Sequence, residues 1–183
     1  MQDFFASDAG QCASIAKAFL EGAKTLDAAR RDAGKKILFQ PTLALAGHGL
    51  ELLLKASSYL NGRPPPTKGQ KGHDILTLWD ADVCEPVRGH VFTNAHIVAA
   101  TDRESGEYPD VPEDDEVPKL IEEYVLELGR LHGGTAGYPL RYPSDPSQKA
   151  PRTPFLVKSL WATADDFVKR PDDFELTRFR GRT

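Results

Sequence analysis

Three ionisable side chains, His48, Glu51 and Lys55, lie within an otherwise apolar segment, GHGLELLLKASSYLNG, which begins at residue 47. An imidazole can transfer protons near neutral pH. A lysine ammonium can bind a phosphate, and a neighbouring carboxylate can orient it. Because each residue of a helix advances by about 100°, the three side chains share an arc of roughly 80°. The leucines cover the remaining surface, so the segment predicts a buried helix with one narrow polar stripe.

This polar stripe (His48, Glu51 and Lys55) allows three interpretations. It can be a solvent-exposed face on which Glu51 and Lys55 form an i,i+4 pair worth about 0.2–0.5 kcal/mol. It can be buried and paired with groups on a facing helix or loop. It can also line a site at the mouth of a helical bundle. Our hypothesis places it on a water-accessible ridge, close in space to His73 and Asp74.

Further candidates follow from the chemistry of RNA cleavage without a metal, which needs a base for the 2′-hydroxyl and a cation or acid near the phosphate. His48, His73, Arg141 and the pair Arg88 and His96 are of suitable types, and Tyr142 could stack on a base.

Two of the candidates also have structural alternatives. Asp74 can cap a helix, with His73 bonding the preceding turn, and Arg141 can tie its loop to an acidic residue. No HExxH motif or Cys/His spacing typical of zinc is present, so we expect no metal and no cofactor.

The elements that must position these residues are helices. Apolar residues recur at helical spacing, and no strand alternation is visible. In the first helix we expect Ile15 to face the core and Asp27 to face away from it. The expected helices cover about 8–33, 41–60, 73–103 with an interruption or kink at Pro86, 118–131 and 155–170. Pro- and Gly-rich or acidic loops separate them, including 104–116. The prediction is an all-α, antiparallel bundle of four to five helices with long loops, forming one domain over 1–183 with a frayed basic tail over 171–183.

Composition narrows the class of protein. The 183 residues carry a net charge of −4, which argues against a broadly basic nucleic-acid coat but leaves room for a local basic site. No apolar run approaches the roughly 20 residues of a membrane span, and the N-terminus lacks a secretory signal pattern. Cys12 and Cys84 lack CxxC spacing, as in reduced core thiols. We therefore expect a cytoplasmic protein with no membrane partner.

One stretch resembles a known family. It reads ALAGHGLELLLKASSYLNGRPPPTKGQKGHDILTLW and joins the polar helix to a Pro/Gly loop and a Gly-His-Asp-Ile start of the next helix. This order resembles the HEPN family of all-α proteins, and the later GYPLRYP, residues 137–143, resembles a segment near the end of some members. The resemblance implies a helical bundle, often a homodimer. Members include ribonucleases of toxin–antitoxin or phage-defence systems, partners of nucleotidyltransferases, and proteins that bind RNA or nucleotides without cleaving.

The nuclease members resemble one another in an Arg followed, after four to six residues, by a His. This chain departs from that pattern, because seven residues separate Arg88 from His96. The resemblance therefore implies an RNA- or nucleotide-associated module, with a nucleotidyltransferase or antitoxin as a possible partner. Two alternatives stay open: an active, metal-independent endoribonuclease with a displaced site at Arg88 and His96, and a non-catalytic structural or protein-binding domain.

Overall fold

The computed structural model describes residues 3–34, 36–66, 73–106, 111–133, 139–140 and 150–181, and they contain helices and turns without a strand. This confirms the predicted all-α class. The helices are α1 (Asp8–Asp32), α2 (Phe39–Leu60), α3 (Ile75–Asp80), α4 (Glu85–Ser105), α5 (Val117–His132), α6 (Thr153–Lys169) and α7 (Leu176–Arg180). Short 3-10 turns are η1 (Phe4–Ala6), η2 (Lys36–Leu38), η4 (Asp82–Cys84) and η6 (Pro171–Phe174).

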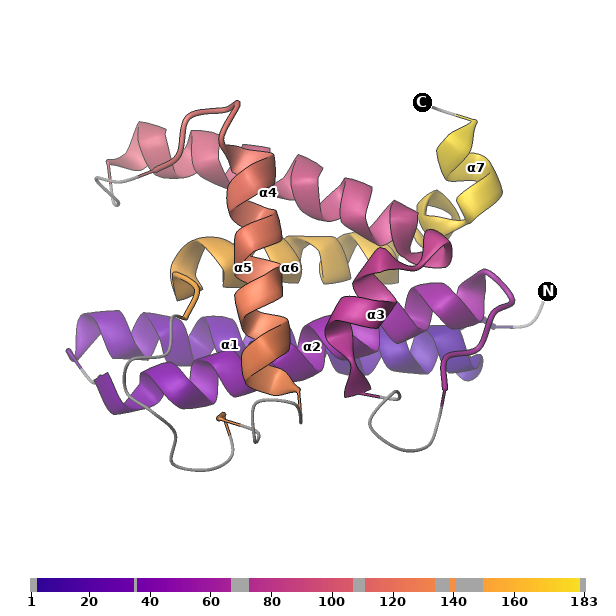
Figure 1. Cartoon of the computed structure of the whole chain (residues 1–183), viewed down its shortest axis with the longest axis horizontal. Helices are drawn as coiled ribbons and strands as arrows, with labels where there is room; N and C mark the ends of the chain where they lie inside the picture. Colours follow the sequence, from indigo (N-terminus) through magenta and orange to yellow (C-terminus); the bar gives the residue numbers. More distant parts are fainter. Residues whose placement is uncertain are drawn as a thin grey trace.

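The long helices form a bundle in which α5 crosses the others. The helices α1 and α2 lie antiparallel and make the most extensive contact in the structure. In Figure 1, α6 lies between this pair and α4, and it packs against both α1 and α4. The orange helix α5 runs steeply across them, and its C-terminal end reaches α2. This end-on approach brings the last residues of α5 to the polar side of α2.

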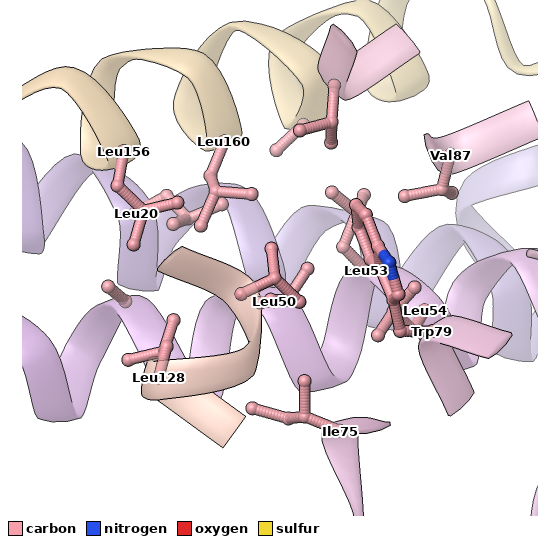
Figure 2. Close-up of a cluster of buried hydrophobic side chains, with 14 of the residues drawn as sticks. Leu20, Leu50, Leu53, Leu54, Ile75, Trp79, Val87, Leu128, Leu156 and Leu160 are labelled. Carbon is pink, nitrogen blue, oxygen red and sulfur yellow. The ribbon is translucent and has the colours of Figure 1, made fainter. Parts of the chain in front are cut away.

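The core gathers apolar side chains from α1 to α6, and leucine is its commonest residue type (Figure 2). Leu20 of α1, Leu50 of α2, Leu128 of α5 and Leu160 of α6 are all completely buried. Burying such a side chain stabilises the fold by roughly 1.5–3 kcal/mol. The helices α5 and α6 each contribute a row of apolar side chains to this cluster, among them Ile121, Leu128, Leu156 and Phe167.

Prolines mark the starts of several helices. Pro86, Pro118 and Pro154 all lie in first turns, where a proline removes no intrahelical hydrogen bond. The expected interruption near Pro86 therefore takes a particular form. The chain leaves the helical conformation at Ala81, and Pro86 then opens α4 instead of kinking a continuous helix.

The predicted orientation of α1 is wrong at two positions. Ile15 is 49% exposed, and Asp27 is buried. Asp27 is buried because it has partners: its Oδ1 accepts a hydrogen bond from Thr153 at the start of α6 at 2.6 Å, and Arg30 and Arg31 pair with its two oxygens. A paired carboxylate can enter an interface that an unpaired one would avoid.

The tail was predicted to be frayed over 171–183, and this is wrong for residues 171–181. Phe174 is completely buried and lies 4.2 Å from the ring of Phe167 and 4.1 Å from that of His90. The amide of Asn61, at the end of α2, donates to the Phe174 carbonyl at 3.1 Å and accepts from the Leu176 amide at 2.7 Å. An aromatic anchor and backbone hydrogen bonds thus hold the tail on the bundle.

The segment Lys36–Leu60 is long and apolar enough to cross a membrane when length and composition alone are considered. This corrects the expectation that no apolar run approaches that length. Half of its most apolar window is buried inside the fold, which is also what the central helix of a packed domain shows.

Candidate functional site

The most heavily bonded side chain of the polar stripe is Glu51, which is only 3% exposed. Its Oε1 accepts hydrogen bonds from Lys55 Nζ at 2.6 Å and from His73 Nδ1 at 3.0 Å. Its Oε2 accepts a hydrogen bond from His132 Nε2 at 2.8 Å. Both carboxylate oxygens therefore have nitrogen donors. We call His48, Glu51, Lys55, His73 and His132 the Glu51 cluster.

Three segments bring these residues together. The helix α2 places Lys55 one turn after Glu51, in the i,i+4 order that favours an ion pair. The C-terminal residue of α5 is His132, which therefore enters where α5 meets α2. His73 lies just before the first turn of α3 and reaches Glu51 from the other side.

The two glycines of the Gly-His-Gly sequence allow close packing on α2. A Cβ at Gly47 would lie 2.7 Å from His132 Nδ1, and a Cβ at Gly49 would lie 2.5 Å from Leu20 Cγ. Both distances are shorter than real contacts to a Cβ. Gly47 therefore provides the space for the imidazole of His132, while Gly49 provides the space for α1.

His48 completes the cluster on its partly exposed side. Its ring meets the ring of His132 edge-to-face, with the centroids 4.7 Å apart. On its other side it lies 5.5 Å from the ring of Phe19. His48 is thus held between α1 and α5 at the edge of the buried carboxylate.

The electrostatics of the cluster favour an ionised Glu51. Burial by itself would raise the pKa of this carboxyl, but the hydrogen bonds from His132 and Lys55 outweigh burial and lower the pKa from 4.5 to about 2. The carboxylate therefore stays charged throughout the neutral range and can hold cationic groups or ions around it.

The arrangement corrects one part of the ridge hypothesis and confirms another. Glu51 is not on a water-accessible ridge, and the side chain of Lys55 is only 16% exposed, so the buried and paired interpretation holds. The expected proximity to His73 is confirmed. The side chain of His73 is 56% exposed, which makes His73 the most accessible residue of the Glu51 cluster.

Asp74 serves its own helix. Its Oδ1 accepts hydrogen bonds from the amides of Leu76 and Thr77 at 3.1 and 3.3 Å, and its Oδ2 accepts one from the Thr77 hydroxyl at 2.6 Å. It is the N-cap of α3, as the structural alternative predicted.

Arg88 and His96 are not brought together within the chain. The guanidinium of Arg88 donates to the carbonyls of Trp79 and Ala81, and it thereby closes the turn between α3 and α4. His96 follows eight residues later on the same helix, which corresponds to about 12 Å along the axis. The other two sequence candidates, Arg141 and Tyr142, lie outside the described residues.

The residue that the sequence interpretation missed is His132. A single residue separates it from Arg130, which is too few for the Arg–His spacing of the nuclease members. A usable signal was present, because His132 continues the buried row of Tyr124 and Leu128 at intervals of four. A polar residue in such a row needs a partner in the core.

A separate cavity of about 510 Å³ lies between the 111–116 segment, the start of α5 and Arg152. Acidic and basic side chains alternate along it, among them Glu116, Lys119 and Glu123. Such a mixed surface presents no single charge to a ligand, so the Glu51 cluster is the better candidate site.

Comparisons with known proteins give no assignment: no family model matches the chain, and no significant match to a curated protein or a solved structure is found. The chemistry of the Glu51 cluster is therefore the basis for assigning a function.

Proposed function

We propose that this chain is a HEPN-like helical module that binds RNA or a nucleotide, of the toxin–antitoxin or defence type. The observation that carries the proposal is the convergence of Lys55 Nζ and His73 Nδ1 on one oxygen, at 2.6 and 3.0 Å from Glu51 Oε1. All three residues lie within the stretch that carries the sequence resemblance. Nitrogen donors arranged in this way suit the oxygen of a phosphate as well as that of a carboxylate.

Lys55 and His73 keep further polar atoms that Glu51 does not use, and these support the proposal. A lysine ammonium has three N–H groups, and the bond to Glu51 uses one of them. His73 has a second ring nitrogen and an exposed ring that could also stack on a base. The charges of Glu51 and Lys55 cancel, so the pair itself does not repel an anion that approaches the remaining N–H donors.

The test is binding of a short, fluorescently labelled single-stranded RNA and of ATP and GTP, measured by anisotropy and calorimetry at two salt concentrations. We expect affinity that falls with salt, because phosphate contacts release counterions. His73→Gln and Lys55→Gln should each weaken binding several-fold. Lys158→Gln is the matched control, since Lys158 pairs with the buried Asp102 at 2.7 Å in another part of the bundle.

The proposal fails if the wild-type chain binds neither RNA nor nucleotides, or if Lys55→Gln and Lys158→Gln lower affinity equally. The first result would favour a second candidate, a structural or protein-binding domain. Glu51 accepts hydrogen bonds from three donors, and such a network can hold α2, α5 and the start of α3 together. This observation supports a structural role.

Catalysis by Arg88 and His96 has weaker support, because the Arg88 guanidinium already binds two carbonyl groups. RNA loss in the presence of EDTA, abolished by His96→Ala, would support that alternative. We also propose a cytoplasmic homodimer, with a nucleotidyltransferase or antitoxin as a possible partner, on the basis of the resemblance alone. Light scattering of the purified chain tests the dimer.

A further inference from the structure

We propose that His48, Glu51 and His132 form a binding site for a divalent transition-metal ion, most suitably Zn²⁺. Each residue offers one ligand atom, and the three atoms all lie within 4.8 Å of one another. This inference is independent of RNA binding. It also reverses the expectation from sequence spacing that the chain has no metal site.

The ligand atoms lie near one another but are not yet at the separations that a zinc ion requires. Bonds from Zn²⁺ to imidazole nitrogen and carboxylate oxygen are about 2.0–2.2 Å, which places tetrahedral ligand atoms roughly 3.3 Å apart. The pair Glu51 Oε2 and His132 Nε2 is now at 2.8 Å, joined by a hydrogen bond. Zn²⁺ would take the place of the Nε2 proton of His132, which would move to Nδ1 by exchange with solvent so that the imidazole stays neutral, and the two ligand atoms would separate slightly. The wider separations, up to 4.8 Å, involve His48, whose ring would have to shift within its contacts with Phe19 and His132 to bind the ion.

The two oxygens of Glu51 have separate tasks in this proposal. Oε2 faces His132 and would bind the metal, while Oε1 is held by Lys55 and His73. Ligating carboxylates in metalloproteins are commonly hydrogen-bonded in this way by outer groups, which fix their orientation. Lys55 and His73 would thus act as positioning residues for the carboxylate ligand.

The scaffold already holds the ligands in place. Glu51 and His132 are buried on two long helices, and Gly47 leaves the space that the His132 imidazole occupies. Sites built on packed helices are more rigid than sites on loops. Three protein ligands leave a fourth position, which would open on the partly exposed side at His48 and could take water or an oxyanion.

The donor set decides which ion fits. Two imidazoles and one carboxylate suit zinc and its neighbours, whereas Mg²⁺ and Ca²⁺ prefer sites made of oxygen atoms alone. Thiolates would also bind zinc, but burial raises the pKa of Cys84 to about 11, and neither cysteine belongs to the group of three.

The experiment is calorimetric titration of the whole, chelator-treated chain with Zn²⁺, with Co²⁺ as a spectroscopic probe and Mg²⁺ as a negative control. We expect one Zn²⁺ per chain and a visible Co²⁺ spectrum of tetrahedral nitrogen and oxygen coordination without a thiolate band. His48→Gln should weaken zinc binding by more than the 10–100-fold that loss of an outer group costs. The controls are His90→Gln and Cys12→Ser, which remove a histidine and a cysteine outside the proposed site. Both should leave the affinity for zinc unchanged.

His132→Gln provides a second test at the buried ligand, and circular dichroism shows whether each variant keeps its helices. The wild-type measurement decides even if a variant fails to fold. Absence of stoichiometric Zn²⁺ binding, a thiolate band with Co²⁺, or equal affinities of the His48→Gln and His90→Gln variants would each overturn the proposal. RNA binding is measured separately, so its failure leaves the metal result intact.

Discussion

Replacing Gly47 with alanine tests whether His132 depends on the absence of a side chain on α2. The new Cβ would lie 2.7 Å from His132 Nδ1 and 3.0 Å from its Cγ. Since ordinary contacts are about 3.5–4.0 Å, the imidazole must move by roughly 1 Å. The bond from its Nε2 to Glu51 would then lengthen from 2.8 Å beyond hydrogen-bonding distance.

Two opposing effects set the size of the change. A hydrogen bond to a charged group contributes about 1.5–3 kcal/mol, and the displaced ring relieves most of the direct overlap. Alanine in a helix interior favours folding by about 1 kcal/mol relative to glycine. The net loss should therefore be about 0.5–2 kcal/mol, which for a chain of this length lowers Tm by about 1–8 °C.

Gly22→Ala is the matched control, because it makes the same change inside α1. Its Cβ would meet only Leu45 Cδ1, at 3.2 Å, and the end of a leucine side chain can move aside. This variant should gain about 0.5–1 kcal/mol from helix propensity. Urea unfolding of both variants measures the difference. Equal stabilities would refute the claim that Gly47 provides the space for His132.

Three further outcomes are expected. Asp74→Ala should lower the free energy of unfolding by about 1 kcal/mol in urea, through loss of the α3 cap, whereas Asp74→Asn should nearly preserve it. Asn61→Ala should release the tail and accelerate trypsin cleavage at Arg178, seen by mass spectrometry, because Asn61 supplies two hydrogen bonds to the 174–176 backbone. Burial, mainly, lowers the pKa of His90 in the folded state, so the unfolded chain binds more protons. The stability due to His90 is therefore complete above pH 6.5 or so and declines below it, and His90→Phe should flatten the dependence of unfolding free energy on pH between about 7 and 5.

The helices could be predicted because their signals are local. Apolar residues at helical spacing located α5 and α6, each within one continuous segment. The burial of Asp27 could not be predicted in this way. Its partner Thr153 lies 126 residues away, and only the packing of α6 on α1 makes a buried carboxylate acceptable there.

The candidate site divides along the same line. The i,i+4 spacing indicated the pair of Glu51 and Lys55. The Gly-His-Asp-Ile segment, which resembles the HEPN family, indicated His73. The bond between Glu51 and His132 spans 81 residues, and no spacing rule for a single helix can find it. The polar stripe was also read as accessible because the angles of a helix give a face, while burial of that face depends on which helix crosses it.

Stability alone does not explain why a carboxylate is buried at position 51. Replacing a buried ionic network by apolar side chains is often neutral or stabilising, and leucines already surround Glu51 on α2. Two variants can distinguish phosphate binding from metal binding. His73 contacts Glu51 Oε1, whereas His48 lies beside His132, which contacts Oε2. If phosphate binds at the Lys55 edge, His73→Gln should weaken RNA binding while His48→Gln does not. If a metal ion itself receives the phosphate in its fourth position, His48→Gln and EDTA should both abolish RNA binding, and His73→Gln should only reduce it.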